Sequence, residues 1–148
     1  MRSALVLLIL ISRCACSYAA LGSAPSDFGV QKNGVKARSL AAASATYHIN
    51  ETTLDSGTVV HEYVATSSGS VFAVSWAGPS MPDLRTLLGD SFTTLTTEAA
   101  KRPKAGHSQL NITGQDVVII SAGHMRAYHG QAWIPSQLPA GFTSAGID

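Results

Sequence analysis

The sequence is short of charged residues and of cysteine, and these shortages exclude several classes of protein. Charged residues make up 13% of the 148 positions, about half of the roughly 25% usual in soluble domains. The formal net charge of +1 gives no basic surface for nucleic acid. Phosphate-binding glycine loops and dinucleotide-binding fingerprints are absent as well. Apolar residues nevertheless reach 45%, so the composition is that of a folded chain rather than a disordered one.

The N-terminal twenty residues have the layout of a secretory signal peptide. Arg2 supplies a positive charge, residues 4–11 form an uninterrupted apolar run, and small residues follow. The run is far shorter than the ~20 residues that cross a bilayer. We therefore expect cleavage near Ala19 or Ala20 and a periplasmic or secreted location, with membrane contact only through the signal peptide during export.

Both cysteines, Cys14 and Cys16, lie inside this segment. Cleavage after it would leave a mature chain without disulfides, zinc–thiolate sites or a cysteine nucleophile. Arg13 stands where a lipoprotein signal needs other residues, so lipidation is not expected. Loss of Arg2 and Arg13 would leave eight basic and nine acidic residues, a net charge of about −1.

The rest of the chain divides into an extended leader over residues 21–44 and a single α+β domain over residues 45–148. Three strands are expected near residues 47–54, 58–65 and 71–77, because turn signals at residues 55–57 and 67–69 separate them. Connections this short favour an antiparallel meander.

A short helix follows the third strand. Ser80 is its expected N-cap, Leu84, Leu87 and Leu88 share one face, and Gly89 ends it. Residues 90–100 combine a helical apolar spacing with four threonines, which leaves helix and strand both open. Further strands are expected at residues 107–113, 117–121 and 125–134. The predicted fold is therefore α+β: an antiparallel sheet of about five to six strands, with one short helix inserted after the third.

His124 and His129 are the first candidates for catalysis or metal binding. Residues five apart on one strand point to opposite faces, so the two imidazoles would converge only if the strand were broken near Gly123 or Gly130. No carboxylate completes a recognisable ligand set. We therefore assign no metal ligand, no cofactor and no catalytic residue.

Two blocks of the sequence resemble an uncharacterised family of short exported bacterial proteins, found mainly in proteobacteria, called domain of unknown function 2844. The first block is Trp76-Ala-Gly-Pro79 with Pro82-Asp83-Leu84 and Leu87-Leu88-Gly89, and the second is Gly123-His-Met-Arg126 with Gly130. Ala122 stands where a second glycine is expected, Gln131 stands where arginine is common, and residues 93–106 match poorly.

The resemblance also covers Ala20-Leu21-Gly22, which is similar to the start of the family's mature chains and so implies cleavage nearby. It implies export from a bacterial cell. It assigns no activity, cofactor or catalytic residue.

The expected function is a non-enzymatic domain that binds another envelope protein or a surface component. The candidate binding residues belong to the two family-like blocks and are Asp83, Arg85, His124, Arg126, Tyr128 and His129. An ion pair between Arg126 and Asp83 would give two of these residues a purely structural role.

Two alternatives stay open. The first is a small hydrolase or metal-dependent enzyme that uses His124 and His129 with Asp83 or Asp116. The second is a small-ligand carrier, in which Trp76 and Tyr128 line a cavity between sheet and helix.

Overall fold

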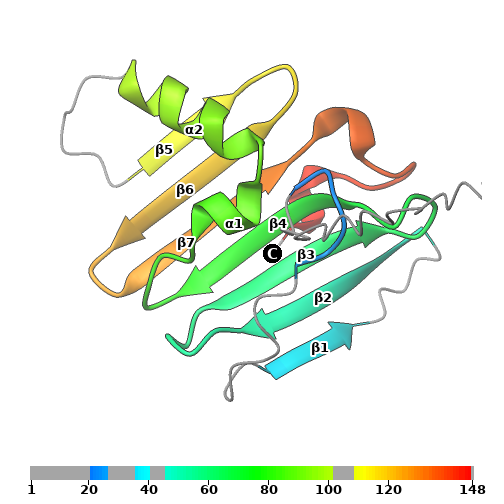
Figure 1. The fold of residues 1–148 in the computed structure, drawn as a ribbon, viewed down its shortest axis with the longest axis horizontal. Helices are drawn as coiled ribbons and strands as arrows, with labels where there is room; N and C mark the ends of the chain where they lie inside the picture. Colours follow the sequence, from blue (N-terminus) through cyan, green and yellow to red (C-terminus); the bar gives the residue numbers. More distant parts are fainter. Residues whose placement is uncertain (1–20, 27–35, 41–45, 102–108, 148) are drawn as a thin grey trace, which may run out of the picture.

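The computed structural model describes residues 21–26, 36–40, 46–101 and 109–147. Their main element is one antiparallel sheet of seven strands in the order β1-β2-β3-β4-β7-β6-β5 (Figure 1). The strands are β1 (Lys36–Leu40), β2 (Tyr47–Thr53), β3 (Val59–Ala65), β4 (Val71–Gly78), β5 (Gln109–Thr113), β6 (Val118–His124) and β7 (Ala127–Trp133). The α+β class with an antiparallel sheet is thus confirmed.

The first four strands form a meander, as the turn signals predicted. Gly57 and Gly69 both adopt a positive φ in the two tight connections that flank β3. Strand β4 is buried at each of its first six positions, which agrees with its central place in the sheet. Strand β7 pairs with the other side of β4, so the three C-terminal strands extend the same sheet.

Strand β1 is one more strand than the sequence predicted, and it lies in the segment that was expected to be an extended leader. Its five residues pair with β2 along their whole length. An edge strand is held on one side by its backbone hydrogen bonds and does not need the apolar alternation of a half-buried strand. Periodicity therefore gave no signal here.

Two helices, not one, separate β4 from β5: α1 (Leu84–Leu88) and α2 (Ser91–Ala100). The N-cap of α1 is Asp83, not Ser80, because the Asp83 carboxylate accepts hydrogen bonds from the amides of Arg85 and Thr86. Ser80 instead bonds through its backbone to the Thr58 hydroxyl. The helix therefore starts three residues later than its expected cap.

The segment that forms α2 is the one that the sequence left undecided. Its buried residue is Leu95, and Phe92 packs partly buried against the same core. Two apolar contacts to the sheet outweigh the weak helix propensity of the threonines. The helical spacing was the signal that prevailed.

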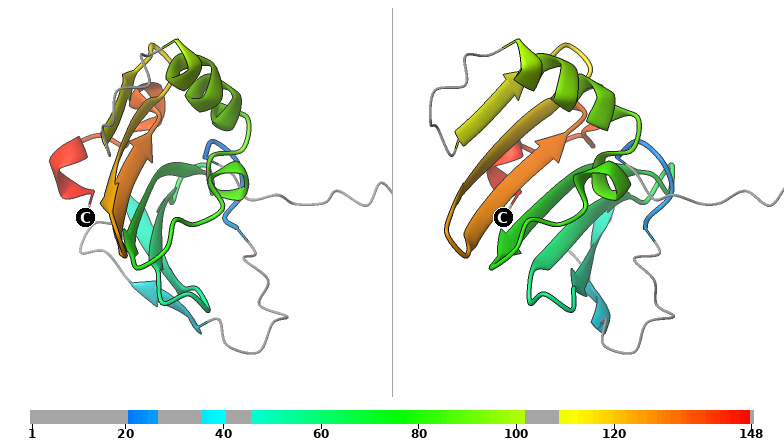
Figure 2. Two further views of the ribbon diagram at one scale, coloured as in Figure 1. Left: turned by 90° about the vertical axis from the view of Figure 1, so that its left-hand side faces the viewer. Right: turned by 60° about the vertical axis from the view of Figure 1, so that its left-hand side comes forward.

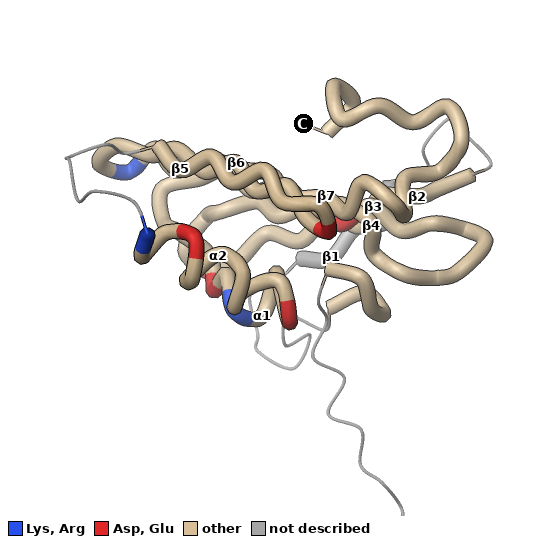
Figure 3. The backbone as a smooth tube through the Cα atoms, turned by 90° about the horizontal axis from the view of Figure 1, so that it is seen from above, with Lys and Arg blue, Asp and Glu red and all other residues tan. Residues whose placement is uncertain are grey.

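The two faces of the sheet are covered differently (Figures 2 and 3). Helices α1 and α2 cover one face, called here the helix face. The C-terminal segment, with the short 3-10 helices η1 (Pro135–Gln137) and η2 (Ser144–Gly146), lies against the other. On that face, Phe142 of the C-terminal segment packs in an aromatic cluster with Tyr47, Tyr63 and Phe72 of the sheet.

Residues 21–26 are packed onto the helix face. Leu21 is buried in the core there, and its amide donates to the carbonyl of Leu87 at 3.2 Å. The amide of Gly22 and the carbonyl of Ser23 bond to the backbone of Val71. This short segment is therefore fixed beside the first helix.

Candidate functional site

The predicted binding residues are divided between the two faces of the sheet. Asp83 and Arg85 lie at α1 on the helix face, and Tyr128 points to the same side, towards Gly123. Strand alternation places His124 and His129 on the opposite face. The six residues therefore form no single site.

Asp83 has a structural role in capping α1. Its carboxylate accepts the Thr86 hydroxyl at 2.8 Å and the Arg85 amide at 3.0 Å. These hydrogen bonds, with that of the Thr86 hydroxyl strongest, lower the pKa of Asp83. Arg85 lies 5.2 Å from the centre of the Phe92 ring, a cation–π contact between the two helices.

The expected ion pair between Asp83 and Arg126 does not form. Ion pairs elsewhere in the described ranges join His61 to Glu51 and Lys101 to Glu98. Arg126 was expected on a strand, but with Met125 it forms the two-residue turn between β6 and β7 and has a φ of 65°. Met125 is 95% exposed at this tip.

The sequence predicted His124 and His129 on a single strand, with their side chains on opposite faces. Because of this turn they lie on the paired strands β6 and β7, and both side chains are on the same face. His129 pairs with Ala122, two residues before His124, so the imidazoles are diagonal neighbours on adjacent strands. Both side chains are exposed.

Neither of the two carboxylates expected beside the histidines lies next to them. Asp83 lies on the other side of the sheet. Asp116 precedes β6 whereas His124 ends it, a separation of roughly 25 Å at about 3.3 Å per residue. Among the residues whose side chains are described, no cluster of three or more histidine, cysteine or acidic residues suits a metal ion.

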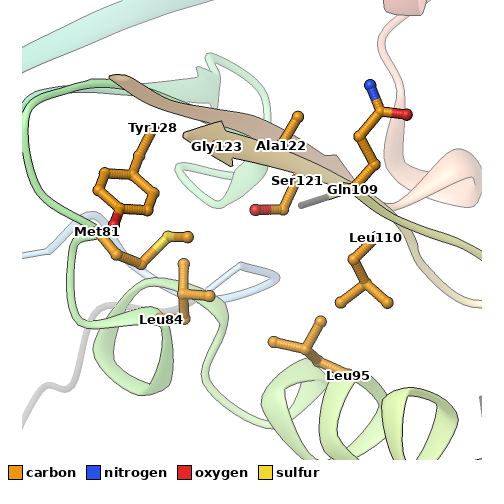
Figure 4. A pocket seen from close by; sticks show the side chains of 9 residues that line it. All are labelled: Met81, Leu84, Leu95, Gln109, Leu110, Ser121, Ala122, Gly123 and Tyr128. Carbon is orange, nitrogen blue, oxygen red and sulfur yellow. The ribbon is translucent and has the colours of Figure 1, made fainter. Parts of the chain in front are cut away.

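The helix face contains a cavity of about 310 Å³ (Figure 4). One wall comes from the helices and the loop before them, the other from β5, β6 and β7. The lining residues are Met81, Leu84, Leu95, Gln109, Leu110, Ser121, Ala122, Gly123 and Tyr128. None is charged. Met81 is 42% exposed and lies where the cavity meets solvent.

Tyr128 lies against one wall of this cavity because β6 has a glycine opposite it. Tyr128 pairs with Gly123, and a Cβ on that glycine would lie 2.4 Å from the Tyr128 ring. The absent side chain lets the ring lie close to the sheet. Of the two aromatic residues expected to line a cavity, Tyr128 does so and Trp76 does not.

Sequence reasoning missed most of the cavity. Leu84 was seen only as part of a core-facing stripe, and Leu95 belonged to the undecided segment. Ser121 directly follows four apolar residues, Val117 to Ile120. A polar residue at the end of the expected buried strand was the one sequence feature that could have indicated a polar group in a cavity wall. It carried little weight in a chain rich in serine.

Glu62 is the most deeply buried acid among the described residues, with 3% of its surface exposed. Its carboxylate accepts hydrogen bonds from the amide and the hydroxyl of Ser26. Burial raises the pKa of Glu62, and the Ser26 hydrogen bonds partly oppose that rise. Glu62 fixes the N-terminal segment and does not line the cavity.

Within the described ranges no helix has the length and apolar character that crossing a membrane requires. The expected signal peptide and the cysteines Cys14 and Cys16 fall outside the described residues.

The chain was also compared with known proteins. No curated protein and no solved structure gives a match. A protein-family model described as "Protein of unknown function (DUF2844)" matches residues 17–147. That match covers most of the sequence and confirms the resemblance seen in the two motif blocks. The chain belongs to the DUF2844 family.

Proposed function

We propose that this protein is an exported, non-enzymatic binding domain that takes a small apolar molecule into the cavity between its helices and its sheet. The observation that carries the proposal is the cavity itself, about 310 Å³ in volume and lined by Leu84, Leu95, Leu110 and Tyr128. Ligand sites in proteins are typically apolar hollows of about 300–1,000 Å³ with few polar groups.

The size and lining of the cavity limit the ligand. A cavity of about 150 Å³ holds benzene, so this one has room for roughly two such rings. A charged ligand would lose its hydration without gaining a countercharge, because none of the described residues that line the cavity is a lysine, arginine, aspartate or glutamate. The proposed ligand is therefore neutral and mainly apolar.

Binding is favoured over catalysis because the chemical groups are separated. Asp83 caps a helix, and His124 and His129 face away from the cavity. The cavity wall itself offers hydroxyl and amide groups from Ser121, Tyr128 and Gln109, and these suit recognition. The envelope protein or surface component expected from the sequence would be the donor or acceptor of the carried molecule.

Binding is tested with N-phenyl-1-naphthylamine, a neutral apolar dye that fluoresces when it leaves water. We expect saturable one-to-one binding to the purified domain. In L84W the larger side chain fills the cavity, and the dissociation constant should rise about tenfold or more. T93W places the same indole on an exposed position of α2 and is the matched control. Absence of saturable binding, or equal loss in both variants, would refute the proposal.

Export is tested separately by the intact mass of the affinity-tagged protein recovered from its host's envelope fraction. Cleavage near Ala19 or Ala20 should give a chain that starts at Ala20 or Leu21 and carries no lipid. A mass that includes residues 1–19 would contradict export through a cleaved signal peptide. Native mass spectrometry of the same sample would also report a bound small molecule or a copurifying protein.

A further inference from the structure

Met81 places a thioether at the mouth of the cavity. Its residue is 42% exposed, and it lines the cavity together with Leu84 and Tyr128. Figure 4 shows the side chain extending from the loop before α1 into the space between Tyr128 and Leu84, with the sulfur atom on the cavity side. The thioether therefore borders the apolar space while the residue stays accessible from solvent.

Met81 is also one of the few residues of this chain that contain sulfur. The sequence has three methionines and two cysteines, and Met1, Cys14 and Cys16 belong to the expected signal peptide. Removal of that segment leaves Met81 and Met125 as the sulfur-containing residues of the exported protein. Exported proteins work in an oxidising environment. Without a cysteine thiol in the mature chain, peroxides react with these two thioethers.

Oxidation of Met81 would change the polarity of the cavity mouth. Hydrogen peroxide transfers one oxygen atom to the sulfur and releases water, so the thioether loses two electrons and becomes a sulfoxide. The product is a polar, chiral group in place of a flexible apolar one. An apolar ligand that contacts Met81 would then meet a hydrated oxygen beside Leu84, and its binding would have to remove that water.

We infer that Met81 is an oxidation site that controls the cavity, and that its conversion to the sulfoxide releases the neutral apolar ligand. The inference rests on the proposed function, since it assigns a regulation to the same cavity. The reduced thioether completes the apolar wall around the ligand. Reduction of the sulfoxide by a thiol-dependent methionine sulfoxide reductase returns the thioether, with a disulfide and water as the other products, and restores binding.

Met125 supplies a control within the same chain. It is 95% exposed in the turn between β6 and β7, and the described residues that line the cavity do not include it. Because exposure favours oxidation, peroxide should modify Met125 before Met81. Loss of ligand binding should therefore follow the second oxygen atom that the protein takes up, and not the first.

The test compares the dissociation constant of N-phenyl-1-naphthylamine before and after peroxide treatment of the purified protein. Wild type and M125L should bind the dye about three- to tenfold more weakly once peptide mass spectrometry shows the sulfoxide at Met81. M81L, whose leucine has a similar volume and cannot be oxidised, should bind equally well before and after treatment. A mixture of the two epimer-specific methionine sulfoxide reductases with dithiothreitol should restore the affinity of oxidised M125L.

The outcomes separate this inference from the proposed function. Unchanged affinity in M125L with Met81 fully oxidised would overturn the inference and leave the binding function standing. An equal loss in peroxide-treated M81L would also overturn it, because the loss would then come from another residue. Loss of the native circular dichroism spectrum in oxidised M125L would overturn it too, since release is inferred for a folded domain. Failure of the untreated wild-type protein to bind the dye would remove the binding function itself.

Discussion

The indole of Trp76 covers Gly130, its partner across the ladder between β4 and β7. A Cβ on Gly130 would lie 2.2 Å from Cζ2 of Trp76 and 2.7 Å from the carbonyl oxygen of Ile120. The glycine therefore makes room for the largest buried side chain of the core. This pair joins the meander to the C-terminal strands beside the cavity.

Substitution of Gly130 by alanine should therefore destabilise the protein. The added methyl group must displace Trp76 or the backbone, and overpacking of this kind costs about 1–3 kcal/mol. Urea unfolding monitored by circular dichroism measures the loss. G146A is the control, because a Cβ there meets its nearest neighbour, Phe142, at 3.9 Å. Wild-type stability in G130A would contradict the packing described.

Glu62 should make the protein less stable as pH rises. Burial holds the pKa of Glu62 above its ordinary value of 4.5, so the native state binds this proton more tightly than the unfolded state does. The contribution of Glu62 to the free energy of unfolding is then highest below pH 4.5. It falls as pH rises through the raised pKa and levels off above it.

The isosteric variant E62Q removes this ionisation. E62Q should be more stable than the wild type at neutral pH, and the difference should shrink as pH falls towards the ordinary pKa of glutamate. Urea unfolding at a series of pH values measures both curves. E98Q removes the same charge from α2, in an exposed pair with Lys101, and controls for net charge. Parallel curves for E62Q and the wild type would disprove the assignment.

Loss of the Asp83 cap should destabilise α1. D83A removes the acceptor for the amides of Arg85 and Thr86 and should cost about 1 kcal/mol. D83N keeps a side-chain oxygen and should recover most of the loss. Because the pKa of Asp83 is lowered in the folded protein, this contribution is present above the ordinary value of 3.8 and is lost as pH falls below it. Equal stability of D83A and D83N would rule out the capping role.

The exposed histidines should not affect ligand binding. His124 and His129 lie on the face opposite the cavity, so the double variant H124A/H129A should bind N-phenyl-1-naphthylamine with the wild-type dissociation constant. Tyr128 lies between the two histidines in the sequence but lines the cavity. The Y128A variant should therefore bind the dye about fivefold more weakly, on the order of 1 kcal/mol. A weaker affinity in the histidine variant would place the site on the other face.

The strands that the sequence predicted are those with a strong local signal. The largely apolar run of β4 and the turns that contain Gly57 and Gly69 specify a meander without reference to the rest of the chain. Strand β1 had no such signal, because its place depends on the free edge of β2. The second helix needed the sheet, since packing of Leu95 decides between two conformations that its threonines leave close in energy.

The candidate site was predicted less well than the fold. Tyr128 was expected beside a cavity between sheet and helix, and it lies there. Asp83 and Arg126 were expected to approach each other, but Asp83 is used by its own helix, and Arg126 occupies a turn. The spacing of residues along the chain could not predict the capping role of Asp83 or the turn position of Arg126, because both depend on where a helix or a strand begins.

The sequence by itself determined the α+β class, the meander, the short helix after it and the family. Such features follow from the order of apolar residues, turn residues and caps along the chain. Only the tertiary structure decided that Leu84, Leu95, Ser121 and Tyr128 surround one cavity, and that the two histidines share the other face. A cavity forms where separate elements fail to fill the space between them, and no single segment carries that information.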